Sequence, residues 1–314
     1  TNQLANGILQ KDFDELLLSE EKPFFNRALK GRYPPASSIK PAIAMYGIEE
    51  GLIDWDFSIF DEGFFTLPED GRIYRDWKEG GHGDTNLFKA ITQSSNTYFF
   101  DLAYRSDINQ LNKHLSSLGF GDKACIDCFE EDKVFVPEPS WKMNKHNFGW
   151  FKGDTVNMGV GQGYLVSTPI QLAKYAYIIA NKGKFSDLSL KKDLVKNEKS
   201  IEFNKFSNDD WFKLHESMVN VIEGNTGTAR RLRERKNYIV AAKTGTAELV
   251  SGDNREQYSE TRLDDSLRDH ALIIAFGPMP NPRYAVSVVV ENGESGGSVA
   301  GPVAISVLNS LIQE

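Results

Sequence analysis

Three runs of apolar and β-branched residues near the end of the chain constrain the fold more than any other feature. They span residues 238–242, 270–276 and 284–291, and each has the length of a buried strand. Residues 302–313 follow with the apolar spacing of a helix. Residues 251–267 are too many for a tight hairpin, so we expect a surface flap there. Residues 236–314 are therefore predicted to form a sheet lobe.

The preceding part of the chain, about residues 41–235, is predicted to be a mainly helical lobe. Apolar residues recur at helical spacing over 37–51, 86–104, 108–118, 169–181 and 209–223. Residues 1–36 indicate loop plus a short helix, and residues 141–153 a long loop. With 314 residues, of which 40% are hydrophobic, the chain can bury a core of this size. We expect one domain, residues 1–314, of the α/β (α+β) class.

Charge and hydropathy exclude two classes of partner. The net charge is -8 and no long basic run is present, so a nucleic-acid surface is not expected. No stretch has the roughly 18 to 20 consecutive apolar residues of a membrane helix, and residues 1–4 lack the pattern of a signal peptide. We expect a soluble chain that carries no membrane anchor.

Cys125 and Cys128 form the one CxxC motif of the chain. Such spacing is compatible with a redox pair, half of a zinc site, a local disulfide or unreactive thiols. The motif lies in a predicted acidic loop, which disfavours a reactive thiolate. We therefore favour unreactive thiols or a local disulfide.

Ser37 and Lys40 form an S-x-x-K tetrad at the predicted start of the first long helix. Three-residue spacing places the hydroxyl and the amine on one helix face. A buried lysine near a second cation loses its proton and can activate a serine as a nucleophile. An isolated tetrad is also typical of an N-cap serine followed by a surface lysine.

Two further motifs lie far along the chain. Ser94 and Asn96 supply a hydroxyl that can relay a proton and an amide that can hold a peptide carbonyl or the catalytic lysine. Lys243, Thr244 and Thr246 surround Gly245 directly after a predicted strand, where they can receive a carboxylate and a substrate backbone. Each motif alone has an ordinary structural explanation, but the order S-x-x-K, S-x-N, K-T-G is typical of β-lactam-recognising serine enzymes.

The chain resembles the class B penicillin-binding proteins, and most of all their elongation (rod-shape) branch, usually called penicillin-binding protein 2. The runs that carry the resemblance cover nearly the whole chain: 31–35 (GRYPP), 74–77 (YRDW), 81–83 (GHG), 94–99 (SSNTYF), 153–155 (GDT), 159–164 (GVGQGY), 168–171 (TPIQ), 242–247 (AKTGTA) and 267–270 (LRDH). The resemblance implies a penicillin-binding transpeptidase fold, similar to serine β-lactamases, with an antiparallel sheet flanked by helices.

The resemblance also implies a function, peptidoglycan D,D-transpeptidation during cell wall biogenesis and cell elongation. Ser37 would be the acylated nucleophile, Lys40 its base, and Ser94 and Asn96 the relay and amide-binding pair. Lys243, Thr244, Gly245 and Thr246 would bind the terminal carboxylate, and the backbone N–H groups of Ser37 and Thr246 would form the oxyanion hole. Implied partners are stem peptides, β-lactam antibiotics and a membrane glycosyltransferase. Such proteins determine cell shape and are anchored in the bacterial inner membrane with the catalytic domain in the periplasm.

The chain also departs from the pattern of the family. The family's sheet has five strands, two of which precede the S-x-x-K helix, so we expect those first strands to be missing here. Some members of this branch hold zinc near the active site with two Asp, a His and a Cys, and by this resemblance Asp61, Asp76 and His82 are candidate ligands. Ser95 occupies the thiolate position. The alternative is that Asp76 pairs with an arginine and His82 with a loop carbonyl, with no cofactor required.

Two classes of rival function stay under consideration, and a third is rejected. A β-lactamase or a β-lactam sensor shares the three motifs, but a β-lactamase needs a carboxylate that activates water, and none is recognisable. A non-catalytic cell-wall scaffold would not need Ser37, Lys40 and Lys243. A Ser-His-Asp triad using Asp269 and His270 is rejected, because neighbouring residues of a strand point in opposite directions and no G-x-S-x-G motif is present.

Overall fold

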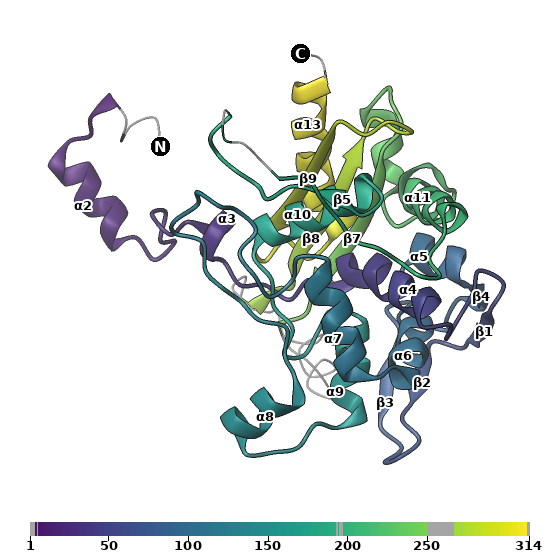
Figure 1. The fold of residues 1–314 in the computed structure, drawn as a ribbon. Coiled ribbons are helices and arrows are strands. Elements are labelled where there is room, and N and C mark those ends of the chain that lie inside the picture. Colours follow the sequence, from purple (N-terminus) through teal and green to yellow (C-terminus); the bar gives the residue numbers. More distant parts are fainter. Residues whose placement is uncertain (1–3, 5, 193, 195–196, 250–266, 313–314) are drawn as a thin grey trace.

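A three-stranded antiparallel sheet forms the C-terminal part of the molecule, in the order β7-β8-β9 (Figure 1). The computed structural model describes every residue except 1–3, 5, 193, 195–196, 250–266 and 313–314. Strands β8 (His270–Gly277) and β9 (Tyr284–Val290) confirm two of the predicted runs. Nearly all of the flap predicted at 251–267 lies outside the described residues.

Strand β7 (Ala241–Ala247) differs from its prediction. It begins three residues later than residue 238 and contains the K-T-G motif, which was expected to follow the strand. The physical reason is pairing along the whole motif, in which Lys243 lies opposite Ile274 and Thr246 opposite Ala271. The motif is therefore part of the sheet edge.

The sheet is covered on both faces. Alternate residues of β8, Leu272, Ile274 and Phe276, pack into the larger core with helices α10 (Pro169–Ala180) and α11 (Asn208–Glu223). The intervening residues pack into a second core with helix α13 (Gly301–Ile312), which lies along the sheet in Figure 1. A strand buried on both faces has a continuous apolar sequence, which is why the run that forms β8 was recognisable.

The helical lobe surrounds α4 (Lys40–Glu49), of which every residue but the last is buried. Helices α7 (Ile108–Ser117), α10 and α11 confirm their predictions. The single helix predicted at 86–104 was wrong, since the chain forms α5 (Leu87–Gln93) and α6 (Asn96–Arg105). The break follows from Ser94, whose left-handed backbone (φ 61°) ends α5.

The remaining elements are short. The loop predicted at 141–153 instead holds most of one helix and the start of another. In the part of the chain that the structure describes, no strand precedes the S-x-x-K segment, and α2 stands apart from the body of the molecule in Figure 1. None of the described helices combines the length and apolar character needed to cross a membrane. The remaining short helices and strands of the described chain are α2 (Gln10–Leu18), α3 (Arg27–Lys30), η1 (Ala36–Ile39), β1 (Ser58–Asp61), β2 (Phe64–Thr66), β3 (Ile73–Arg75), β4 (Gly83–Asn86), α8 (Pro139–His146), α9 (Lys152–Gly159), β5 (Lys184–Phe185), β6 (Lys199–Ser200), η2 (Arg230–Arg235) and η4 (Gly296–Ala300).

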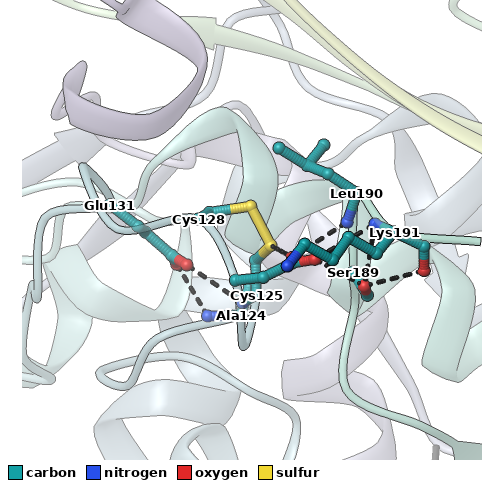
Figure 2. Close-up of a disulfide and its surroundings, with 8 residues drawn as sticks. Ala124, Cys125, Cys128, Glu131, Ser189, Leu190 and Lys191 are labelled. Carbon is teal, nitrogen blue, oxygen red and sulfur yellow. Dashed lines mark hydrogen bonds between the residues drawn. A yellow bond between two sulfur atoms is a disulfide. The ribbon is translucent and has the colours of Figure 1, made fainter. Parts of the chain in front are cut away.

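The CxxC motif forms a local disulfide between Cys125 and Cys128, both of them buried (Figure 2). The carboxylate of Glu131 accepts hydrogen bonds from the N–H groups of Ala124 (2.6 Å) and Cys125 (2.9 Å). This confirms the local disulfide among the alternatives. Because the two sulfurs are bonded to each other, they are not thiolate ligands for a metal.

Candidate active site

The nucleophile segment is the 3-10 turn η1, which continues directly into α4. Ser37 lies one turn before Lys40, whose N–H donates to the carbonyl of Ser37. Ala36 has a left-handed backbone with φ 48°. Its N–H donates to the carbonyl of Gly161 (2.8 Å). A Cβ at Gly161 would lie 2.2 Å from the carbonyl oxygen of Ala36, so this close approach requires glycine.

Lys40 is completely buried at the start of α4. Its Nζ donates to the carbonyl of Ser94 (2.8 Å) and to Oδ1 of Asn96 (2.7 Å). Burial lowers the pKa of Lys40 to about 7, while the negative charges of Asp76 and Asp61 act in the opposite direction. A large share of this amine is therefore neutral near neutral pH, which is the form that accepts a proton.

Ser94 connects the two lysines of the site. Its hydroxyl accepts a hydrogen bond from Nζ of Lys243 (2.7 Å) and lies 3.4 Å from Nζ of Lys40. Its carbonyl also accepts a hydrogen bond from Nε1 of Trp77 (3.1 Å), a residue that sequence reasoning did not assign to the site. The left-handed conformation of Ser94 thus brings its carbonyl into contact with Lys40 and its hydroxyl into contact with both lysines.

Lys243 is the second fully buried lysine. Burial and the charge of Lys40 hold the pKa of Lys243 well below its usual value. Two ammonium groups that share one hydroxyl repel each other, so the site disfavours double protonation. The structure thus brings four of the predicted residues together, Lys40, Ser94, Asn96 and Lys243, with Ser37 one turn away.

Strand β7 contributes the edge of the site. Gly245 packs against the nucleophile segment, and a Cβ there would lie 3.2 Å from the carbonyl oxygen of Pro35 and 3.3 Å from the nitrogen of Ser38. Thr246 is exposed, and its carbonyl accepts from Nε2 of Gln162 (3.3 Å). Among the described strands β7 pairs with β8 alone, so its other edge can pair with an extended peptide.

Thr228 was also missed by sequence reasoning. Its hydroxyl lies 2.7 Å from the hydroxyl of Thr244, whose side chain is almost buried beside Lys243. The neighbouring Thr226 accepts a hydrogen bond from Nε2 of Gln93 (3.0 Å), on the helix that ends at Ser94. The segment 226–228 therefore extends from α5 to β7 across the site.

Comparison with known proteins identifies the family. The family described as the penicillin binding protein transpeptidase domain matches residues 4–309 of the chain. The chain belongs to this family. The penicillin-binding fold expected from the sequence motifs is thereby confirmed, as is the antiparallel sheet with flanking helices.

Relatives of this transpeptidase domain include the peptidoglycan D,D-transpeptidase MrdA of two bacteria. The Acinetobacter baumannii protein is 39% identical over 308 residues, which are 95% of this chain and 45% of the relative. The Haemophilus influenzae protein is 37% identical over 321 residues, which are 100% of this chain and 49% of the relative. The chain thus spans about half the length of the curated relatives it matches.

Solved structures support the same branch. The penicillin-binding protein 2 of Pseudomonas aeruginosa, solved in complex with WCK 5153, has a TM-score of 0.87 and 36% identity, and the match covers 98% of this chain and 67% of that chain. The penicillin-binding protein 2 of Helicobacter pylori has a TM-score of 0.83 and 30% identity, with 99% and 55% covered. The predicted resemblance to penicillin-binding protein 2 is therefore confirmed.

The predicted metal residues of this transpeptidase domain lie together. Asp61, Asp76 and His82 are clustered so that one ligand atom of each lies within 4.8 Å of the others. Nε2 of His82 is buried, makes no hydrogen bond to any residue that the structure describes, and lies 3.3 Å from Oδ1 of Asp76. Ser95, in the fourth position, donates its hydroxyl to Oδ2 of Asp61 (2.7 Å). Two carboxylates and the buried Nε2 of His82 are three ligand groups that fit a divalent cation.

The alternative prediction, in which Asp76 pairs with an arginine and His82 with a loop carbonyl, was wrong. Asp76 does not pair with an arginine in the described chain but accepts from the N–H groups of Asn96 (2.6 Å) and Thr97 (2.9 Å), at the start of α6. His82 contacts Oε1 of Gln93 (3.0 Å) in place of a loop carbonyl. Burial raises the pKa of Asp76, but His82, Lys40 and the amides outweigh it and hold this pKa well below its usual range. Asp76 thus positions Asn96.

Proposed function

We propose that this domain, residues 1–314 acting as one unit, is a D,D-transpeptidase that cross-links peptidoglycan stem peptides during cell elongation. The observation that carries the proposal is the meeting of two buried lysines, Lys40 and Lys243, at the hydroxyl of Ser94. Lys40 lies one turn after Ser37 in the same helical segment. Burying two amines has a large free-energy cost, which a merely structural role does not explain. The name D,D-transpeptidase of its relatives supports the same reaction.

In the first half-reaction, Ser37 attacks the carbonyl of the penultimate D-Ala. A neutral amine has two N–H groups and one lone pair. The carbonyl of Ser94 and the amide oxygen of Asn96 accept the two N–H groups of Lys40, which leaves its lone pair for the proton of Ser37. The new C–O bond forms as the carbonyl becomes an oxyanion, held by the N–H groups of Ser37 and Thr246.

The oxyanion then collapses and the C–N bond breaks. The leaving amine takes a proton through the hydroxyl of Ser94, which the two lysines contact, and D-Ala departs. In the second half-reaction an amine of a neighbouring stem peptide attacks the ester. It gives up one proton along the same route, the ester C–O bond breaks, and Ser37 regains its proton.

Substrate binding uses the open edge of β7 and the buried polar groups beside it. Lys243, Thr244 and Thr246 would receive the terminal carboxylate. Its negative charge would then lie next to the two buried lysines and offset their positive charge. A β-lactam carries a carboxylate and a strained amide in the same relation, so it would acylate Ser37.

Intact-mass spectrometry with a fluorescent penicillin tests the proposal. We expect one covalent adduct per chain, which Ser37→Ala abolishes while the far-ultraviolet circular dichroism stays unchanged. A folded sample without an adduct would contradict the proposal and favour the non-catalytic scaffold. Steady-state hydrolysis of nitrocefin separates the β-lactamase alternative, because a transpeptidase keeps its acyl-enzyme and a β-lactamase turns over.

The whole protein is proposed to act with a partner of the cell-wall machinery, a membrane glycosyltransferase. The penicillin-binding protein 2 of Helicobacter pylori has been solved in a complex with MreC, which supports the presence of a protein partner but does not name the glycosyltransferase. Co-purification of the full-length protein with the glycosyltransferase from detergent-solubilised membranes tests the pairing.

We propose that the domain works in the periplasm, attached through the full-length protein to the inner membrane. The disulfide between Cys125 and Cys128 supports an oxidising compartment, where such bonds form and persist (Figure 2). Alkylation of cells before lysis, followed by mass spectrometry, should find both cysteines protected. Complete alkylation would contradict this location.

A zinc ion held by Asp61, Asp76 and His82 is a separate proposal, and acyl transfer does not require it. When bound, the ion would neutralise carboxylate charge near Lys40 and hold residues 61–82 against α6. Elemental analysis should find zinc in wild type, none in His82→Ala and tighter binding in Ser95→Cys, which supplies a thiolate. A metal-free wild type whose melting temperature is unchanged by added zinc would contradict this proposal.

A further inference from the structure

Trp77 is a half-exposed indole that donates its N–H group to the active site. Its Nε1 donates to the carbonyl of Ser94 (3.1 Å), while 58% of the residue is exposed. The indole ring also contacts the ring of His82, with 5.5 Å between the two centroids. Burial of an apolar ring is therefore not what Trp77 contributes to the fold, and its one polar group is bound to the S-x-N motif.

Trp77 and the residue before it hold two different parts of this motif. The carboxylate of Asp76 accepts from two N–H groups at the start of α6, one of them that of Asn96 (2.6 Å). Trp77 instead donates to the carbonyl of Ser94, which comes before those N–H groups in the chain. The segment 76–77 thus binds the motif on both sides of the turn between α5 and α6.

The carbonyl of Ser94 belongs to a residue whose backbone conformation is unfavourable in isolation. Ser94 has a left-handed φ of 61°, which brings its Cβ close to the backbone. Such a conformation persists where its surroundings hold it. Two donors of the described chain hold this carbonyl, Nζ of Lys40 (2.8 Å) and Nε1 of Trp77 (3.1 Å). Only the indole N–H does not titrate, so it holds the carbonyl in either protonation state of the lysine.

The position of this carbonyl controls the direction of the amine of Lys40. A carbonyl oxygen has two lone pairs, so Trp77 can occupy one and leave the other to Lys40. Neutral Lys40 donates one N–H to Ser94 and the other to Oδ1 of Asn96. Its lone pair points where these two acceptors leave room, so a rotation of the Ser94 peptide plane would turn it away.

We propose that Trp77 is a positioning residue for acyl transfer. Its indole N–H fixes the carbonyl of Ser94 and thereby directs the lone pair of Lys40 toward the hydroxyl of Ser37. The proposal rests on the proposed function and adds to it a residue that neither gives nor takes a proton. In this role Trp77 acts through Ser94 and requires no contact with the substrate.

The test removes the indole N–H with and without the indole ring. Benzothienylalanine at position 77 replaces the N–H by sulfur and keeps the shape of the ring, whereas Trp77→Phe also makes the ring smaller. Stopped-flow acylation at increasing concentrations of a fluorescent penicillin separates the first-order rate constant of acylation from the dissociation constant of the preceding complex. Both variants should lower the rate constant by about 2- to 10-fold, the factor for one hydrogen bond between uncharged groups. The dissociation constant of the benzothienylalanine variant should stay unchanged.

Trp55→Phe is the matched control. Nε1 of Trp55 donates to Oδ1 of Asp210 (2.8 Å) in the first turn of α11, so this variant also removes one indole hydrogen bond. The chain that leads into α11 is bound by Glu49, at the other end of α4 from Lys40. A helix rises about 1.5 Å per residue, so these two ends of α4 lie about 14 Å apart. Trp55→Phe should leave the rate constant of acylation unchanged.

Three results would overturn the proposal. The first is an unchanged rate constant in the benzothienylalanine variant, including the case in which only the dissociation constant rises, which would assign the ring to substrate contact. The second is an equal loss in Trp55→Phe. The third is a loss seen only as a smaller fraction of chains acylated at completion, which indicates misfolding. A wild type that penicillin does not acylate is a different result, since it contradicts the proposed function itself.

Discussion

Replacing Asn96 by aspartate should move the pH dependence of acylation to higher pH. Oδ1 of Asn96 lies 2.7 Å from Nζ of Lys40, and the substitution puts a carboxylate of the same shape there. A negative charge at this distance favours the ammonium form and raises the pKa of Lys40. Only the neutral amine can accept the proton of Ser37, so the rate of acylation should fall below the new pKa.

The size of the shift follows from the geometry. At a mean separation of about 4 Å, one added charge contributes about 1 kcal/mol in water and about 4 kcal/mol at an effective dielectric constant of 20. Since 1.36 kcal/mol corresponds to one pKa unit, the pKa should rise by about 0.7 to 3 units. Starting from a pKa of about 7, the neutral fraction at pH 7 should decrease between about 3-fold and about 500-fold.

Stopped-flow acylation with a fluorescent penicillin, measured from about pH 6 to about pH 10, checks this expectation. The rate of Asn96→Asp should recover toward that of wild type at high pH, because the lost activity is a protonation effect. Asn96→Ala is the control, since it removes the oxygen without adding charge and should lower the rate at every pH. An acidic limb of Asn96→Asp that coincides with wild type would refute the role of Lys40 as base.

Three other expectations follow from the same structure. Ser94→Ala should lower the rate of penicillin acylation by about 100-fold or more, as judged by stopped flow, because the proton relay is lost. Replacing Cys125 and Cys128 by serine should reduce the free energy of unfolding in urea by about 2 kcal/mol, the chain-entropy value for so short a loop. Burial lowers the pKa of His114 from 6.5 to about 4, against the hydrogen bond to Ala42 and the charge of Glu49, so the unfolded chain binds the proton first as the pH falls. Stability should decrease by up to about 3 kcal/mol from pH 6.5 toward pH 4 in wild type, and urea titrations of His114→Gln should show a weaker pH dependence.

Much of the fold was predictable because burial leaves a periodic pattern. Helices α7, α10 and α11 matched their predicted ranges, as did β8 and β9. One error lies where a local backbone conformation interrupts a continuing pattern. The apolar spacing over 86–104 continues across the left-handed turn at Ser94, so periodicity alone could not reveal the break.

Residues that act through tertiary contacts were not predictable. Trp77 belongs to a run that carried the family resemblance but was assigned no role, and Thr228 belongs to no such run. Both reach the site only because β3 and α11 lead the chain past Ser94 and Thr244. Asp76 was predicted as a metal ligand, whereas its contacts with the first turn of α6 became visible only in the fold.

The sequence by itself determined the residue types and the order of the chemistry, because hydroxyl, amine and amide groups at short helical and strand spacings are local properties. It also determined β8, since both faces of this strand are buried and its residues are therefore apolar. Lys40 and Lys243 are two hundred and three positions apart in the sequence. Only the tertiary structure decided that both are buried and contact the hydroxyl of Ser94. Desolvation and proximity depend on what the rest of the chain packs around a group, and no local pattern records them.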